Sequence, residues 1–185
     1  GQTFDLDGVH SMRENSGHVD TSPFTSYNWH GKGNFASMLD VVVLGATEVD
    51  VNFNANVVTH SDGRMLHGIG GWQNCLFSKC TILPIPAFRD RIPIIVDEVT
   101  TLVGPGELID VIVTERGIAI NPLRKDLIKA TKNSGLPIRK IEEIKAEVDD
   151  LIGGAPEKPE LTDEVISVVK WVDGTVIDSI FKVKE

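Results

Sequence analysis

The chain of 185 residues is poor in cysteine, and this scarcity excludes two classes of protein. Its 2 cysteines, Cys75 and Cys80, are too few for a disulfide-stabilised secreted domain or for a structural zinc site. We therefore expect reduced thiols and a cytoplasmic location. Long apolar runs are absent as well, since none approaches the roughly 20 residues of a membrane-spanning helix. The sequence therefore argues against a membrane-embedded protein.

Positive charge is scarce too, and this argues against polyanionic partners. The 18 Lys and Arg residues are outnumbered by 27 Asp and Glu residues, which gives a net charge of −9. A surface of this sign repels phosphate backbones and anionic membranes. The 5 histidines lack metal-binding spacing, so no metal is predicted. With 41% hydrophobic residues, the composition is globular, and we expect residues 1–185 to form a single domain.

Short apolar runs predict β-strands in the first two thirds of the chain. Four runs have this character, at residues 41–44, 92–99, 108–113 and 117–120. The run at 41–44 lies between Asp40 and Gly45, and its continuous apolar character predicts a strand covered on both faces. Strands of this kind are typical of a parallel sheet inside an α/β fold.

Helices and a hairpin are predicted in the last third. Asn121-Pro122 has the pattern of a cap with proline at the first helical position, so it predicts a helix through about Lys132. Apolar residues at helical spacing predict a second helix over 141–151, ended by Gly153-Gly154. Two β-rich runs, 165–172 and 175–183, flank Asp173-Gly174 and predict a β-hairpin. We therefore predict an open, mostly parallel sheet with flanking helices and a C-terminal β-hairpin.

Apolar and polar residues alternate strictly between residues 49 and 57. On a single strand this alternation would place four polar side chains on one face: Asp50, Asn52, Asn54 and Asn56. One interpretation is a row of amides that binds the carboxylates of a polyacid substrate without adding charge. The other is a solvent-exposed face, or a loop whose Asn side chains cap local backbone groups.

A glycine-rich loop follows, and it contains the candidate catalytic residues Gly68, Gly70 and Gly71, beside His67. Glycine lets the backbone approach a ligand closely and present its N–H groups to an anion, as an oxyanion hole requires. The dinucleotide fingerprint is excluded because its third glycine would fall at Gln73. A plain tight turn remains the alternative.

Three basic residues form a small group in this acidic chain: Lys79, Arg89 and Arg91. Basic side chains of this kind can contact a phosphate group of a ligand. The alternative is a solvated surface.

Taken in order, six stretches resemble the C-terminal part of the citrate lyase alpha subunit. They are QTFDLDGVHSMREN from Gln2, LDVVVLGATEVDVNFNANV from Leu39, SDGRMLHGIGG from Ser61, RDRIPIIVDEVTT from Arg89, PGELIDVIVTERGIAINP from Pro105 and DGTVID from Asp173. More distantly, LGATEVD followed by GIGG is similar to the acyl-CoA transferases. The resemblance implies a CoA-transferase-like (NagB/RpiA-type) fold and the later half of a longer subunit.

The resemblance also implies a reaction and partners. The subunit would transfer the thiol of a CoA-like arm from an acetyl thioester to citrate. The arm would belong to an acyl-carrier (gamma) subunit, and a lyase (beta) subunit would cleave the product within an oligomer. The Asp50–Asn56 polar row and His67 would bind citrate, Gly68, Gly70 and Gly71 would stabilise the oxyanion, and Lys79, Arg89 and Arg91 would contact the CoA-like arm.

The sequence departs from the family after the double glycine. The family pattern GGHSDTA would place His and Asp where this chain has Trp72 and Asn74, so two titratable groups are replaced. This departure motivates two alternatives. One is a transferase for another short acid such as malonate, and the other is a non-catalytic domain that docks the acyl-carrier protein.

Overall fold

The computed structural model describes residues 5–19, 35–154 and 157–184. Its central sheet has the strand order β1-β4-β8-β9. The members are β1 (Val42–Val43), β4 (Thr81–Pro84), β8 (Val111–Thr114) and β9 (Gly117–Ile120). β1, β4 and β8 run parallel, whereas β9 returns antiparallel to β8. Leu83, Ile112 and Ala119 of this sheet are buried in the main apolar core.

A second sheet lies beside the first and has the order β3-β2-β7. It consists of β2 (Glu48–Asp50), β3 (Ala55–Asn56) and β7 (Ile95–Val96). β2 pairs antiparallel with β3 and parallel with β7. A short antiparallel pair, β5 (Phe88–Arg89) and β6 (Ile92–Pro93), precedes β7. The predicted strand at 92–99 is therefore two short strands, in separate sheets.

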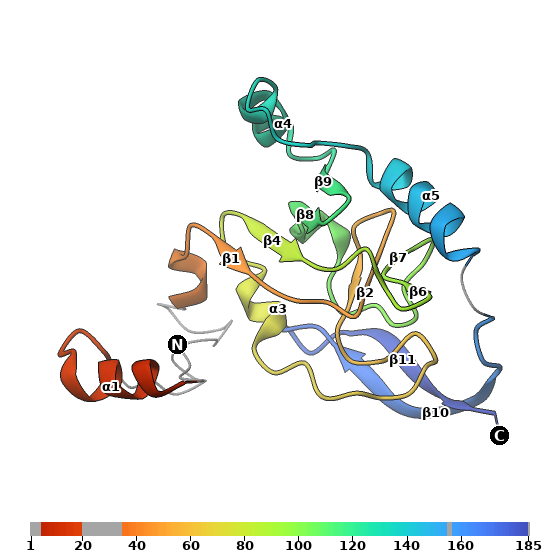
Figure 1. Cartoon of the computed structure of the whole chain (residues 1–185). Helices are drawn as coiled ribbons and strands as arrows, with labels where there is room; N and C mark the ends of the chain where they lie inside the picture. Colours follow the sequence, from red (N-terminus) through yellow and green to blue (C-terminus); the bar gives the residue numbers. More distant parts are fainter. Residues whose placement is uncertain (1–4, 20–34, 155–156, 185) are drawn as a thin grey trace.

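The last sheet is the predicted C-terminal hairpin, formed by β10 (Leu161–Lys170) and β11 (Val176–Val183). Its turn contains Gly174 at φ +92°, a conformation that favours glycine. Val169 and Ile180 extend into the main core, so the hairpin packs on the rest of the molecule (Figure 1). The hairpin prediction is confirmed.

The prediction of a mostly parallel sheet holds in part: the β1–β4 and β4–β8 pairings of the central sheet are parallel, but the strands form several sheets and not one. Among the described residues, three strand pairings are parallel and four are antiparallel. The strand predicted at 41–44 was expected to be covered on both faces, but β1 lies at a sheet edge, and Val43 is 62% exposed. A short apolar run is compatible with an edge strand as well as a central one, because the sequence of a strand does not indicate which strands pair with it. The architecture is mixed α/β.

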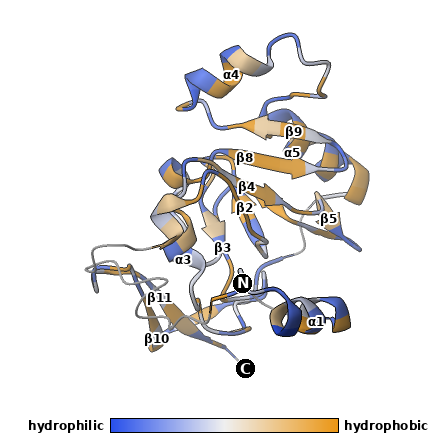
Figure 2. Ribbon diagram, turned by 90° about the vertical axis from the view of Figure 1, so that its left-hand side faces the viewer, coloured by the Kyte–Doolittle hydropathy of each residue, from blue (hydrophilic) through white to orange (hydrophobic). Residues whose placement is uncertain are grey.

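The helices are α1 (Leu6–Glu14), α3 (Trp72–Cys75), α4 (Lys125–Thr131) and α5 (Ile141–Ile152), with 3₁₀ turns η1 (Phe35–Met38) and η2 (Gly106–Leu108). α5 confirms the predicted amphipathic helix: it buries Ile141, Ile144 and Val148 against β6, β7 and β9. Gly153 ends it at φ +78°. Figure 2 shows that apolar ribbon is concentrated in the strands of the sheets. In the described ranges, no helix is both long and apolar enough to cross a membrane.

α4 begins later than predicted, at Lys125 instead of position 122. The buried Asn121 side chain is the reason. Its amide donates to the carbonyls of Gly106 and Ile109, each at 2.8 Å, and its oxygen accepts from Leu123 N–H at 3.0 Å. Asn121 therefore stabilises a turn that ties the chain to η2 before the helix starts.

Candidate active site

Three loops meet where α3 begins, and Trp72 and Gln73 hold them together. The Trp72 Nε1–H donates to the carbonyl of Gly45 at 2.9 Å, and the buried Gln73 amide donates to the carbonyl of Val103 at 3.0 Å. The Trp72 ring also lies against Gly104, where an added Cβ would come within 2.5 Å of the ring. The residues that depart from the family pattern thus fix the glycine loop to the body of the domain.

The glycine loop itself faces open space. A Cβ added to Gly68 or Gly70 would meet nothing within 4 Å, and Gly70 has φ +58°. Within the described part of the chain, the N–H groups of Gly68, Gly70 and Gly71 donate to no protein acceptor. The His67 Nδ1–H donates to Gly68 O at 2.8 Å, which orients the ring along the loop. Unpaired amides beside open space are what a bound anion requires.

The segment 49–57 is a hairpin and not the single strand that its alternation predicts. β2 ends at Asp50 and β3 starts at Ala55, with Phe53 between them at φ +67°. The buried Asp50 carboxylate accepts from the backbone N–H groups of Asn52 at 2.9 Å and Asn54 at 3.0 Å. The Asp50 side chain therefore stabilises the turn. The two-residue alternation of the sequence runs through this turn, although no continuous strand forms.

Two more polar side chains of this hairpin, Asn54 and Asn56, form hydrogen bonds within the fold. The Asn54 oxygen accepts from Gly106 N–H at 2.9 Å. Asn56 is buried, and its amide donates to Glu48 at 3.0 Å and to Thr59 Oγ1 at 2.9 Å. The Asn56 oxygen also accepts from the N–H groups of Val58 and Thr59, each at 3.1 Å, so the interpretation of a side chain that caps local backbone fits Asn56, whereas Asn54 bonds to a distant segment. Asn52 is exposed, so the predicted substrate-binding role remains a prediction that suits this side chain better than its neighbours.

The segment 103–106 joins the hairpin to the glycine loop. Ala55 N–H donates to Gly104 O at 2.9 Å, and Gly106 N–H bonds to Asn54. At the other end of the segment, the carbonyl oxygen of Val103 accepts a hydrogen bond from the Gln73 side-chain amide. The hairpin and the glycine loop thus belong to one hydrogen-bonded unit, although their sequence positions do not predict it.

The three predicted basic residues lie in different places. Lys79 forms an exposed ion pair with Asp40 at 2.5 Å, and its hydrogen bond and then its charge lower the pKa of that carboxyl. Arg91 donates at 3.2 Å to the carbonyl oxygen of Ile152, which is the last residue of α5. Arg89 lines a cavity of about 530 Å³ together with Arg64. Their proposed role in contacting a carrier arm stays a prediction, and the group is not a cluster.

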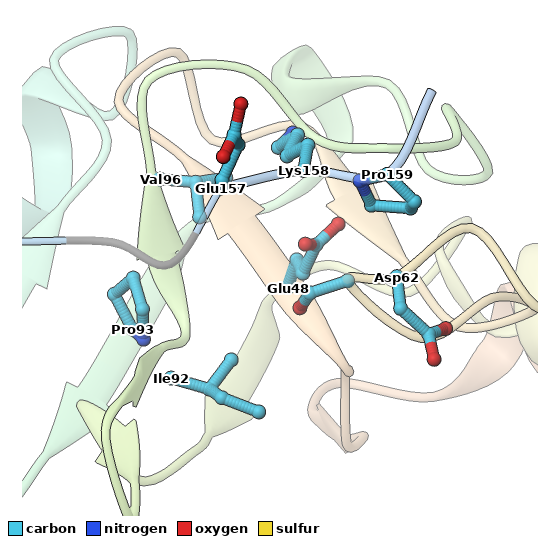
Figure 3. Close-up of a pocket in the computed structure, with 9 residues that line it drawn as sticks. Glu48, Asp62, Ile92, Pro93, Val96, Glu157, Lys158 and Pro159 are labelled. Carbon is cyan, nitrogen blue, oxygen red and sulfur yellow. The ribbon is translucent and has the colours of Figure 1, made fainter. Parts of the chain in front are cut away.

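Next to this cavity is a smaller one of about 170 Å³, which contains the buried carboxylate of Glu48 (Figure 3). Glu48 accepts from Thr100 N–H at 2.8 Å, from Thr100 Oγ1 at 3.1 Å and from Asn56. The segment that carries Lys158 passes over it. Sequence reasoning missed Glu48, although an acid that begins a buried strand requires a hydrogen-bond partner in the core.

These features define a mixed α/β domain that presents a fixed glycine loop with unpaired amides, a class of domain suited to binding an anionic group. Comparison with known proteins identifies the family. The family model for the citrate lyase alpha subunit matches residues 1–183, and the chain belongs to this family.

Two curated relatives are named citrate lyase alpha chain. The one from Escherichia coli (strain K12) is 40% identical over 185 residues, and the one from Klebsiella pneumoniae is 41% identical over 184 residues. The matches cover 100% and 99% of this chain but 36% of each relative. This chain therefore spans about a third of the length of these relatives.

A solved structure has the same fold. The alpha subunit of citrate lyase from Streptococcus mutans, determined in complex with citrate, superposes with a TM-score of 0.91 at 37% identity. The superposition covers 96% of this chain and 35% of that one. The family resemblance read from the sequence is therefore confirmed.

Proposed function

We propose that this chain forms part of the site at which a citrate lyase alpha subunit transfers a carrier thiol from an acetyl thioester to citrate. The observation that carries the proposal is the similarity along the whole chain to citrate lyase alpha chains, with a TM-score of 0.91 to a citrate-bound relative. The domain would be of the CoA-transferase (NagB/RpiA) type, in a cytoplasmic complex with acyl-carrier and lyase subunits.

The chemistry requires two acyl transfers without loss or gain of electrons. A citrate carboxylate attacks the acetyl thioester carbonyl, the C–S bond breaks, and a mixed anhydride and a free thiolate form. The thiolate then attacks the citryl carbonyl of the anhydride and acetate leaves. Each attack places negative charge on a carbonyl oxygen, which hydrogen-bond donors must stabilise.

The glycine loop provides donors for that charge. The unpaired N–H groups of Gly68, Gly70 and Gly71 are preorganised, because Trp72 and Gln73 hold the following residues in place. Preorganised donors stabilise an oxyanion without reorganising during the reaction. Asn52 and His67 are the exposed polar side chains that we assign to the citrate carboxylates.

Citryl thioester formation by the full-length subunit tests the proposal. We expect Gly70→Val to lower the rate at least about 100-fold, because a β-branched residue displaces the loop and one oxyanion donor is worth that much. Gly174→Val is the matched control, since Gly174 also has positive φ and open space but lies in the distant hairpin turn. Equal rates in the two variants, or a preference for malonate over citrate, would contradict the proposal.

A further inference from the structure

The segment that contains α4 projects from the central sheet and returns to it at Ile138, which pairs with Ile118 of β9. We call residues 122–140 the α4 arm; it lies at one end of the molecule in two perpendicular views (Figures 1 and 2). α4 has 7 residues, and none of them is buried. A helix this short is marginal in water unless a packed face stabilises it. Within the described part of the chain, α4 therefore lacks the buried apolar face that usually stabilises such a short helix.

Apolar side chains on the arm are exposed. Leu123, Ile128, Leu136 and Ile138 are 68%, 44%, 50% and 38% exposed, respectively. Ile128 and Ile138 also line a cavity of about 620 Å³ at the base of the arm, whose wall includes Phe53. Several exposed aliphatic residues beside a cavity lined by both apolar and charged side chains are typical of an interaction surface.

The charge of the arm is opposite to that of the chain. Residues 124–140 include six Lys and Arg residues and one acid, Asp126, whereas the whole chain has a net charge of −9. Arg124 pairs with Asp110 at 2.7 Å and with Asp126 at 2.8 Å, and it holds the pKa of Asp126 at about 2. The acid on the arm is thus already neutralised by its neighbour.

Three lysines on the arm remain without a carboxylate. Lys125, Lys129 and Lys132 are exposed and make no ion pair with any described residue. In a chain with an excess of acids, three adjacent unpaired lysines form a surface that attracts an acidic partner. The arm contains no aromatic residue, so it lacks the stacking groups typical of a single-stranded nucleic-acid site.

We propose that the α4 arm docks the protein that carries the thioester, through an acidic surface of that protein with an aliphatic side chain that enters the cavity at the base of the arm. This inference rests on the proposed function, which requires a carrier thioester. Its electrostatic part follows from the unpaired lysines, and its apolar part follows from Ile128, Ile138 and the cavity. Arg124 also connects the arm to the loop between α3 and β4, since it donates to Lys79 O at 3.1 Å.

The test uses the full-length alpha subunit and the acyl-carrier protein, with binding measured by isothermal titration calorimetry. In Lys125→Glu/Lys129→Glu/Lys132→Glu we expect the Kd to rise at least about 30-fold at low salt. We expect the KM for the carrier-bound thioester to rise in parallel. The kcat with free acetyl-CoA should not change, because a free thioester does not use the arm. Ile128→Ser, which changes a side chain that lines the cavity, should raise the Kd about 5-fold without altering charge.

The control carries the same change of charge on another surface. Lys170, Lys182 and Lys184 are exposed on or next to the C-terminal hairpin, so their triple exchange to Glu should leave the Kd within about 2-fold. Circular dichroism checks that α4 persists in the Glu variant. If the helix is lost, a triple exchange of the arm lysines to Gln, which has high helix propensity, is used in place of the Glu variant.

Several outcomes would overturn the docking inference. They are an unchanged Kd in both arm variants, an equal loss in the hairpin control, or arm lysines that mediate self-association or vesicle binding in place of carrier binding. The two proposals fail separately. Citrate transfer from free acetyl-CoA with normal carrier binding by the arm variants removes the docking surface alone. Arm-dependent carrier binding without any citrate transfer removes the proposed reaction alone.

Discussion

Two glycine-rich segments lie on either side of Trp72, and they contain glycine for opposite reasons. In the segment 104–106, glycine is required by packing: a Cβ at Gly106 would lie 2.0 Å from the carbonyl oxygen of Asn52. In the loop 68–71, a Cβ at Gly68 or Gly70 would meet nothing. The comparison teaches that glycine content does not identify a ligand-binding loop. Glycines with open space and unpaired amides are the ones that can serve a ligand.

The largest expected effect is on stability and comes from the packed segment. Gly106→Ala forces a methyl group into backbone atoms of the β2–β3 turn, which cannot move as a flexible side chain would. We expect a loss of about 3 kcal/mol or more in the free energy of unfolding, measured by urea denaturation. Gly135→Ala is the control, because Gly135 has φ +74° but open surroundings. Similar losses in both variants would break the distinction between packed and open glycines.

The second prediction concerns the contact that holds the packed segment to the hairpin. Asn54→Ala removes bonds to the Gly106 N–H and to the Asp50 carboxylate in a half-buried site. We expect a loss of about 2 kcal/mol, because partners at a half-buried site are left unsatisfied. Asn52→Ala in the same turn should cost less than about 0.5 kcal/mol, since its side chain is exposed. A larger loss from Asn52→Ala would assign that side chain to the fold and not to citrate.

The same hairpin shows where sequence reasoning fails. Helix α5 and the C-terminal hairpin were predictable because their signals are local: a helical apolar period and a turn dipeptide. The alternation at 49–57 is also local, yet it continues through a turn. Phe53 is buried and has a left-handed backbone conformation, which a two-residue alternation of apolar and polar residues does not predict.

The candidate site was predictable only in part, for a similar reason. Composition identifies Gly68, Gly70 and Gly71, but it cannot distinguish an open loop from a packed one. What fixes the loop are bonds from Trp72 to Gly45 and from Gln73 to Val103, 27 and 30 residues away in sequence. Contacts at this separation depend on the folded topology, and so does the capping role of Asn54 toward Gly106.

The third prediction tests Trp72 as the link between the two segments. Trp72→Phe keeps an aromatic ring near Gly104 but removes the Nε1–H that donates to Gly45 O. We expect about 1 kcal/mol of lost stability, the net worth of one hydrogen bond, and a lower transfer rate in the full-length subunit. Trp171→Phe is the control, since Trp171 lies next to the turn of the C-terminal hairpin and its ring packs against Phe77 at a 52° tilt, with centroids 5.8 Å apart. An equal fall in transfer rate from Trp171→Phe would show that the effect is not specific to the loop.

The smallest effects should come from the open loop, and they complete the comparison. Gly70→Ala should cost about 1 kcal/mol, because alanine resists the left-handed conformation at φ +58°. Gly68→Ala should change stability by less than about 0.5 kcal/mol, since its φ is not positive and its surroundings are open. Chemical denaturation of both variants beside Gly106→Ala gives the ranking directly. A loss at Gly68 that approached the loss at Gly106 would mean that the loop is packed, and its amides would then be unable to receive an oxyanion.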